Sequence, residues 1–147
     1  MSYEIRRARN DEYALITALL RLSDLPCSDI EASLVELYVA IRDEEIIGTL
    51  GLEYYGDVAL MRSLSVKEAY RTQNIGTSLV EFGCTLAQQR GVEEIYILTT
   101  HAKDYFERFG FGVLLRDAVH KSIQQTREFS SLCPCSAVVM KKVLYKG

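Results

Sequence analysis

The sequence predicts a single mixed α/β domain, and three observations support this prediction. Apolar segments of strand length alternate with short polar turns over residues 38–66. Residues 75–90 then show helical spacing of apolar side chains, and a continuous apolar run of strand length follows at residues 95–99. An antiparallel meander followed by a helix and a buried strand is typical of a mixed α/β or α+β fold. The 147 residues fit one domain, which we expect to span residues 1–147.

Two helices are predicted near the N-terminus. The first covers residues 11–22, with Asn10 or Asp11 as its N-cap. One face of this helix carries the apolar residues Leu15, Ile16, Leu19 and Leu22. Pro26 ends the helix, and a second one is predicted over residues 28–37.

The meander follows from strand-like runs that are separated by turn residues. Four short strands are predicted before residue 67, at residues 3–8, 38–41, 46–54 and 58–66. Asp43–Glu44 and Gly56–Asp57 separate the last three of these strands. Acidic or Gly-Asp pairs between strand-like runs are typical of hairpin turns, so these three strands should be antiparallel neighbours.

The second half of the chain returns to helical spacing. The helix at residues 75–90 carries an apolar stripe of Ile75, Leu79, Phe82 and Leu86. Gly91 follows as its C′ residue, and a short helix at residues 102–109 ends at Gly110. The last two strands are predicted at residues 111–115 and 137–144. The polar stretch between them, residues 116–136, has room for one or two helical turns.

Composition and charge favour a soluble cytoplasmic protein. The 17 basic and 20 acidic residues give a net charge of −3, without a basic block of the kind that binds nucleic acid. No apolar run approaches the roughly 20 residues needed to cross a bilayer. Residues 1–10 are charged and lack the apolar core of a secretory signal. The four cysteines are too few and too unevenly spaced for a disulfide framework, so we expect reduced thiols.

The loop before the long helix has the features of an anion site. It joins the strand ending at Val66 to the helix and reads Arg71-Thr72-Gln73-Asn74-Ile75-Gly76-Thr77. A helix N-terminus presents free N–H groups and a partial positive charge, and Arg71 adds a full charge beside them. A loop residue without a Cβ lets a phosphate approach these groups. The alternative is a plain strand-to-helix turn that contains a glycine.

Two motifs resemble those of a known superfamily. Leu64-Ser65-Val66, followed by the spacing Arg71-x-x-Asn74-x-Gly76, resembles the Arg/Gln-x-x-Gly-x-Gly/Ala signature of GNAT acetyltransferases. Phe106-Glu107-Arg108-Phe109-Gly110-Phe111 resembles their aromatic-x-x-x-Gly-Phe element at a helix-to-strand junction. The resemblance covers nearly the whole chain. It implies a mostly antiparallel seven-stranded sheet that is flanked by helices and splayed between its fourth and fifth strands.

The C-terminal third resembles a bacterial subgroup, the arsenic-resistance-associated N-acetyltransferases, which are relatives of the N-acetylglutamate synthase catalytic domain. The matching segments are Leu98-Thr99-Thr100, Thr126-Arg127-Glu128-Phe129, Leu132-Cys133-Pro134 and Ser136-Ala137-Val138-Val139-Met140. The sequence departs from the superfamily pattern at Asn74, where the signature has its first glycine. Asn is the residue other than glycine that best tolerates the left-handed region, so we expect the loop to keep its shape.

The resemblance implies that acetyl-CoA binds as co-substrate between the fourth and fifth strands, without a metal. Backbone groups of Leu64 and Val66 would pair with the pantetheine arm, and an N–H near Leu64 would stabilise the oxyanion. The expected cofactor-binding residues are Leu64, Ser65, Val66, Arg71, Thr72, Gln73, Asn74, Ile75, Gly76, Thr77 and Phe106.

The superfamily's usual catalytic positions hold other side chains here. The tyrosine that often lies four residues before Gly110 is replaced by Phe106, and the strand glutamate falls at Leu60. Tyr105 is the neighbouring candidate for the acid, but it lies about 100° further around the helix and could be an ordinary core or surface aromatic. Glu53 could act as a base through a water, or could simply point outward from its strand.

Three more features bear on the acceptor site, and Arg62, Arg127 and Cys133 are its candidate residues. Arg62 interrupts an apolar strand, so it has an ion-pair partner or faces the cleft, where it could hold a substrate carboxylate. Arg127 could hold a carboxylate in a bidentate manner or be a solvated loop arginine. Cys133 and Cys135 would suit a soft metal or metalloid, although two ordinary cysteines are the favoured interpretation.

We therefore expect an N-acetyltransferase that transfers acetyl directly to the primary amine of a small molecule, such as an amino acid or an amino-acid-like compound. Glutamate itself is a weak candidate: the related synthases bind glutamate with basic side chains just before the final strand, and the matching residues 132–137 carry no positive charge. The alternative is a non-catalytic CoA-binding or thiol-based metalloid-binding module. The lack of the usual glutamate at position 60 and of the usual tyrosine at position 106 favours this alternative. We expect no nucleic-acid or membrane partner, and a homodimer is left open.

Overall fold

The computed structural model of the chain describes residues 2–23, 25, 27, 35–126, 128–132 and 137–144. These residues build one seven-stranded sheet in the order β1-β2-β3-β4-β5-β7-β6. Its strands are β1 (Glu4–Arg7), β2 (Glu36–Arg42), β3 (Glu45–Tyr55), β4 (Val58–Val66), β5 (Glu94–Thr99), β6 (Gly112–Leu114) and β7 (Val138–Val143). Only β4 and β5 pair in parallel, and the other neighbours are antiparallel. The predicted fold class is confirmed.

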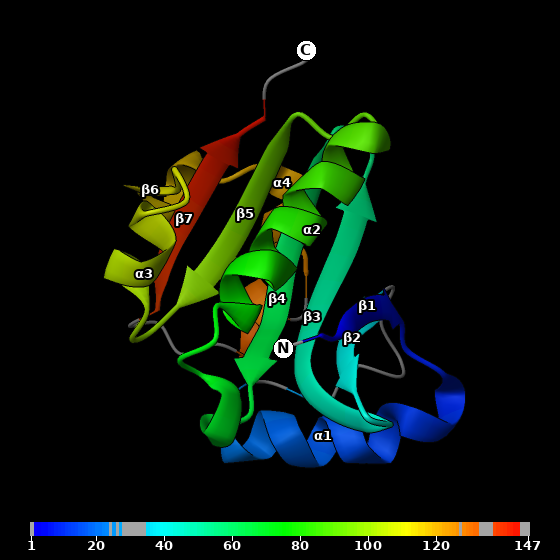
Figure 1. The fold of residues 1–147 in the computed structure, drawn as a ribbon. Coiled ribbons are helices and arrows are strands. Elements are labelled where there is room, and N and C mark those ends of the chain that lie inside the picture. Colours follow the sequence, from blue (N-terminus) through cyan, green and yellow to red (C-terminus); the bar gives the residue numbers. More distant parts are fainter. Residues whose placement is uncertain are drawn as a thin grey trace.

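Helices cover both faces of this sheet. They are α1 (Tyr13–Leu22), α2 (Ile75–Gln89), α3 (Lys103–Glu107) and α4 (Lys121–Gln124). Alternate residues of β2 show the two layers, because Tyr38 and Ala40 pack with α2 whereas Leu37 and Val39 pack with α1. Figure 1 shows α2 and α3 in front of the sheet and α4 behind it. No helix of the described residues is long and apolar enough to span a membrane.

The first helix differs in detail from the prediction. A 3-10 turn, Asn10–Glu12, precedes α1 and is capped at Arg9, so neither Asn10 nor Asp11 is the N-cap. The buried face of α1 consists of Ile16, Leu19 and Leu20. Leu15 and Leu22 are 64% and 85% exposed, because the helix is rotated about its axis relative to the predicted face.

The predicted second helix is wrong at its C-terminal end. Glu36 and Leu37 belong to β2, where they pair with Leu52 and Gly51 of β3. Leu37 is fully buried against α1, so tertiary packing determines its conformation. Residues 28–34, the rest of that prediction, lie outside the described residues.

The long helix α2 packs unusually close to the sheet. Gly83 faces β3 and β4, and a Cβ built on it would lie 2.8 Å from Met61 Cε and 2.9 Å from Leu50 Cδ2. The fully buried line of α2 is Ile75, Leu79, Val80, Gly83 and Ala87. The predicted stripe was therefore correct at Ile75 and Leu79, whereas the other two predicted positions, 82 and 86, are only partly buried. The close approach of the helix to the sheet therefore requires a glycine at position 83.

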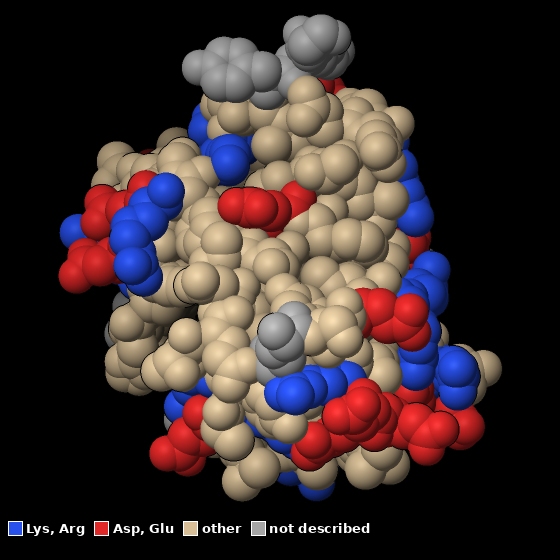
Figure 2. All heavy atoms as spheres, viewed as in Figure 1, with Lys and Arg blue, Asp and Glu red and all other residues tan. Residues whose placement is uncertain are grey.

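The sheet opens between its two parallel strands. Pairing of β4 with β5 runs from Val58↔Glu94 to Leu60↔Tyr96 and then stops, although both strands continue. This divergence is the predicted splay, and it places the C-terminal half of β4 beside a gap. On the face drawn in Figure 2, acidic and basic side chains lie side by side along the lower edge, and the surface over α2 is largely uncharged.

Candidate active site

A cleft of about 1400 Å³ fills the opening between β4 and β5. Residues 61–66 of β4 line one wall, and residues 97–102, at the end of β5 and just beyond it, line the other. The first turn of α2 and the short helix α3 border one end. Ser23, Leu25 and Glu128 also line the cleft. The hydroxyl oxygens of Ser23 and Ser65 are 2.5 Å apart, which ties the end of α1 to β4.

The first turn of α2 has the geometry of an anion cradle. Asn74 is the N-cap, in the left-handed conformation with φ 61° and ψ 22°, as predicted for this position. The first intrahelical bond beyond the cap runs from Ser78 N to Asn74 O at 3.1 Å. The N–H groups of residues 75–77 therefore have no acceptor within the helix. A helix start of this kind attracts negative charge.

Four residues of the predicted loop line the cleft, namely Arg71, Asn74, Gly76 and Thr77. Arg71 donates from Nε to the carbonyl of Val66 at 3.0 Å, which holds its guanidinium at the end of β4. Ile75 is fully buried in the core, so it anchors the loop and can contribute only backbone to a ligand. Thr72 and Gln73 are exposed on the turn before the helix.

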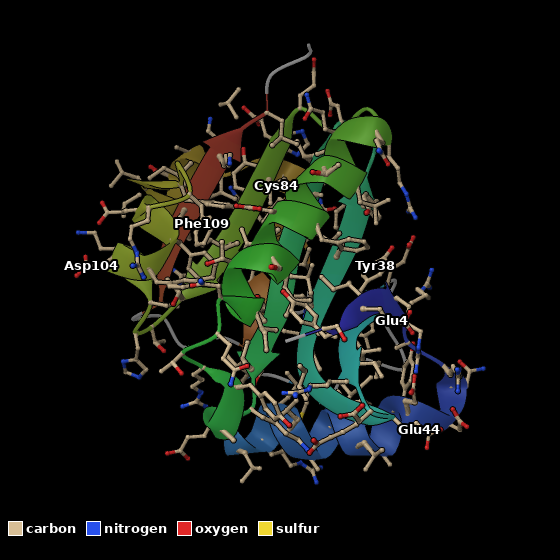
Figure 3. The ribbon with its side chains drawn as sticks, viewed as in Figure 1. Glu4, Tyr38, Glu44, Cys84, Asp104 and Phe109 are labelled. Carbon is tan, nitrogen blue, oxygen red and sulfur yellow. The ribbon has the colours of Figure 1, made fainter. Side chains whose placement is uncertain are left out.

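Tyr105 lies over this first helical turn. A Cβ built on Gly76 would be 2.6 Å from the Tyr105 hydroxyl, so the side chain fits only against a glycine. The ring of Tyr105 packs edge-on against Phe106 and Phe109, with ring centroids 5.3 and 5.2 Å away. Figure 3 shows Phe109 beside α2. Burial raises the pKa of the Tyr105 phenol, against a lowering effect of its hydrogen bond with Thr77 and of the nearby Arg108 charge.

Phe106 is buried in α3 and lines the cleft, where its ring packs against Phe111 at a centroid distance of 5.8 Å. The position therefore offers shape and apolar surface but no hydroxyl. Leu60 is likewise fully buried in an apolar cluster with Val58 and Tyr96. Neither of these positions supplies an acid or a base.

A bulge in β4 was not predicted from the sequence. Thr49 pairs with Ser65 and Gly51 with Arg62, so Leu50 alone faces both Ser63 and Leu64. Ser63 has φ 57°, an uncommon conformation for a residue other than glycine. Thr49 is fully buried and donates from Oγ1 to the Ser63 carbonyl at 2.8 Å. The bulge leaves Leu64 out of the β3 ladder, on the wall of the cleft.

Arg62, just before the bulge, is held by two buried carboxylates. One guanidinium nitrogen (NH1) lies 2.9 Å from Glu53 Oε2, and Nε lies 3.0 Å from Glu128 Oε2. The side chains of Arg62, Glu53 and Glu128 are 0%, 3% and 4% exposed. Tyr55 donates its hydroxyl to the other oxygen of Glu53. Arg62 therefore has the expected ion-pair partners and also lines the cleft, and a role toward a substrate carboxylate stays a prediction.

The candidate base Glu53 is buried, so it does not point outward from its strand. It sits behind Arg62 and is absent from the cleft lining, whereas Glu128 is part of that lining. Sequence reasoning did not single out Glu128. The available signal was Arg62 itself, because a buried guanidinium requires carboxylate partners. The other acceptor-site candidates, Arg127 and Cys133, lie outside the described residues, as does Cys135.

Comparison with known proteins agrees with this geometry. A family model described as an acetyltransferase (GNAT) domain matches residues 33–113, more than half of the chain. An uncharacterized N-acetyltransferase of Chlorobaculum tepidum is 28% identical over 114 residues, which are 74% of this chain and 71% of that protein. An amino-acid acetyltransferase of Pasteurella multocida is 31% identical over 84 residues, or 56% of this chain and 19% of that protein.

Among solved structures, N-acetylglutamate synthase from Neisseria gonorrhoeae, complexed with coenzyme A and N-acetyl-glutamate, matches with a TM-score of 0.85 at 17% identity. The match covers 99% of this chain and 36% of the synthase chain, so it concerns one part of a longer protein. The family model and the curated relatives together support an enzyme of the N-acetyltransferase class. The chain belongs to the GNAT acetyltransferase family.

Proposed function

We propose that this protein transfers acetyl from acetyl-CoA directly to the primary amine of a small molecule. The observation that carries the proposal is the cleft that runs from the bulge in β4 to the N-terminus of α2, with an anion cradle at one end. The coenzyme A complex of the structurally similar synthase supports the same ligand here. Gly76 supports it as well, because the second position of the helix carries no Cβ and Tyr105 can pack over the turn that holds the free N–H groups.

The residues of the cleft fit the parts of acetyl-CoA. The N–H groups of residues 75–77 and the Arg71 guanidinium would hold the pyrophosphate. The backbone of residues 64–66, which lies beyond the pairing of β4 with β5, would pair with the pantetheine arm. The N–H of Leu64, which the bulge removes from the β3 ladder, is the candidate donor to the thioester oxygen as it becomes an oxyanion.

The chemistry needs a neutral amine held against an oriented thioester. Attack forms the new C–N bond, and collapse of the tetrahedral species breaks the C–S bond. Cys84 does not line the cleft, and burial raises the pKa of its thiol, so it is poorly suited to carry the acetyl group. For Cys84 this speaks against a covalent acetyl-enzyme, and direct transfer is the mechanism that we propose.

We further propose an amino acid or an amino-acid-like compound as acceptor. The similarity to an amino-acid acetyltransferase over 84 residues supports this class. Arg62 already binds two carboxylates, so its part in the site is to order them. Arg127 is then the stronger of the two arginine candidates for a substrate carboxylate, and Cys133 stays a candidate for the same region. The relation to the arsenic-resistance-associated subgroup stays a prediction.

Calorimetry with acetyl-CoA, followed by a free-thiol assay over L-glutamate, L-methionine and n-butylamine, tests the proposal. We expect a saturable acetyl-CoA site and release of coenzyme A that depends on an amine. Binding without transfer to any amine would favour the alternative, a non-catalytic CoA-binding module. The apolar side chains at positions 60 and 106, which replace the usual base and acid, support that alternative. Absence of binding would exclude both.

A further inference from the structure

We propose that Glu128 is the general base that takes a proton from the acceptor's ammonium group. The inference rests on the proposed N-acetyltransferase function and adds a residue to it. Among the described residues that line the cleft, Glu128 carries the one carboxylate. Its side chain is 4% exposed, so it meets the cleft while being shielded from bulk water.

The position of Glu128 beside the reacting groups follows from its contact with Arg62. Arg62 immediately precedes Ser63 and Leu64, the two residues of the bulge. The 3.0 Å contact between Arg62 Nε and Glu128 Oε2 ties the carboxylate to the strand that carries the candidate oxyanion donor, Leu64, and both residues line the same cleft. An amine poised to attack a thioester bound there would lie within reach of Glu128.

Glu53 holds Arg62 in place from the side of the guanidinium that faces away from Glu128. Its Oε2 lies 2.9 Å from the opposite side of the Arg62 guanidinium, and Tyr55 donates to its other oxygen. These contacts hold the guanidinium plane, which in turn orients Glu128. Glu53 does not line the cleft, so it is a positioning residue in this scheme.

The segment that carries Glu128 is itself anchored. Thr126 Oγ1 donates to the Ile123 carbonyl at 2.7 Å and accepts from Phe129 N at 3.2 Å. Ile123 is fully buried with Leu60 in the core on that face of the sheet. The carboxylate is thus held by a turn on one side of the cleft and by β4 on the other, as a base with a fixed position requires.

The proton balance is complete. Glu128 accepts one proton from R–NH₃⁺, and the neutral nitrogen forms a bond to the acetyl carbon. The C–S bond then breaks, and the departing thiolate takes the second proton that the nitrogen loses. Glu128 finally releases its proton to water, so the products are the amide, coenzyme A as thiol and one proton.

The test compares Glu128→Gln with Glu53→Gln, because each removes one carboxylate from the same guanidinium. L-methionine and n-butylamine are the probes, and kcat/KM is measured from pH 7 to pH 9. Glu128→Gln should lower kcat/KM by about 10²-fold or more at pH 7. The loss should shrink as the pH rises, because this variant depends on amine that binds already deprotonated, and that fraction grows about tenfold per pH unit below the pKa of the amine. Glu53→Gln should keep the wild-type pH dependence.

Circular dichroism and the acetyl-CoA Kd establish that the variants fold. If Glu128→Gln does not fold, Glu128→Asp replaces it and should lower kcat while keeping the wild-type pH dependence. A Glu128→Gln enzyme with wild-type kcat/KM and pH dependence would overturn the inference. So would a Glu53→Gln enzyme that shows the pH-dependent loss expected of Glu128→Gln. A wild-type protein that transfers acetyl to neither amine would overturn the proposed function first, and the role of Glu128 with it.

Discussion

The Tyr105 hydroxyl lies directly over Gly76, so that a Cβ at position 76 would come within 2.6 Å of it. This contact joins α3 to the first turn of α2, where the cofactor's phosphates are proposed to bind. It also sets the orientation of Tyr105, whose hydroxyl points to the helix start. Tyr105 therefore belongs to the proposed cofactor cradle, and its role as the acid for the departing thiolate stays a prediction.

Gly76→Ala should weaken acetyl-CoA binding, because the new methyl group must displace Tyr105 from the cradle. An overpacked contact of this kind costs about 1–3 kcal/mol. Calorimetry should show a raised Kd, and Gly76→Ala/Tyr105→Phe should recover part of the loss because the clashing oxygen is gone. Gly112→Ala is the matched control, since a Cβ there meets no atom within 4 Å. If Gly76→Ala binds acetyl-CoA with the wild-type Kd, the phosphates do not bind at this turn.

Arg71→Glu should lower acetyl-CoA affinity strongly, because it places negative charge where the pyrophosphate is proposed to bind. It also removes the bond from Nε to the Val66 carbonyl. Arg21→Glu, on the exposed side of α1, makes the same charge change away from the cleft and should leave the Kd unchanged. Equal Kd values for the two variants would show that the phosphates bind elsewhere.

The order of strands and helices could be predicted because each element carries its own signal. Hairpin turns, the helical spacing of α2 and Gly91 with φ +84° are local features. The left-handed conformation of Asn74 was also predictable, since few residues other than glycine tolerate it. The buried face of α1 and the start of β2 were predicted less well, because packing against other elements decides them.

The bulge in β4 and the role of Glu128 needed the three-dimensional structure. Ser63 adopts a positive φ without glycine's freedom, and the bond from Thr49 that accompanies it joins two strands. Glu128 lies in a polar stretch without periodicity, and its pairing with Arg62 spans 66 residues of sequence. The buried arginine predicted that a partner exists, but not which one.

Glu12→Gln should reduce the loss of stability in acid. Arg6 hydrogen-bonds both carboxylate oxygens of Glu12, at 2.9 and 2.7 Å, and this lowers the pKa of that carboxyl to about 2. Because the folded pKa lies below the unfolded value of about 4.5, the pair stabilises the fold above pH 4.5. That contribution disappears as the pH falls toward 2. Partial exposure of the pair limits it to about 1–2 kcal/mol.

Urea unfolding at pH 6 and pH 3 measures this effect. The wild-type protein should lose about 1–2 kcal/mol more between the two pH values than Glu12→Gln does. Asp11→Asn, an exposed carboxylate on the same turn, is the control and should behave like the wild type. An equal loss in all three proteins would contradict the linkage.

Thr49→Val should destabilise the fold and slow transfer. The isosteric change leaves the buried Ser63 carbonyl without its donor, which costs about 1–3 kcal/mol. The bulge should then relax, and kcat should fall more than the KM for acetyl-CoA rises, because the Leu64 N–H serves the transition state. Thr49→Ser keeps the hydroxyl and should retain most of kcat. A loss of stability with unchanged kcat would show that the bulge has no part in catalysis.

The last prediction separates the two arginines near the acceptor. If Arg127 holds a substrate carboxylate, Arg127→Ala should lower kcat/KM for L-methionine by an amount worth about 1–3 kcal/mol and leave n-butylamine unaffected. Arg62→Lys keeps the charge but loses the planar fork that bridges Glu53 and Glu128. It should slow both amines by the same factor, because it disturbs the base and not the recognition of a carboxylate. A selective loss of L-methionine turnover in Arg62→Lys would instead indicate that Arg62 is the carboxylate ligand. Unchanged turnover of both amines in both variants would show that neither arginine is part of the acceptor site.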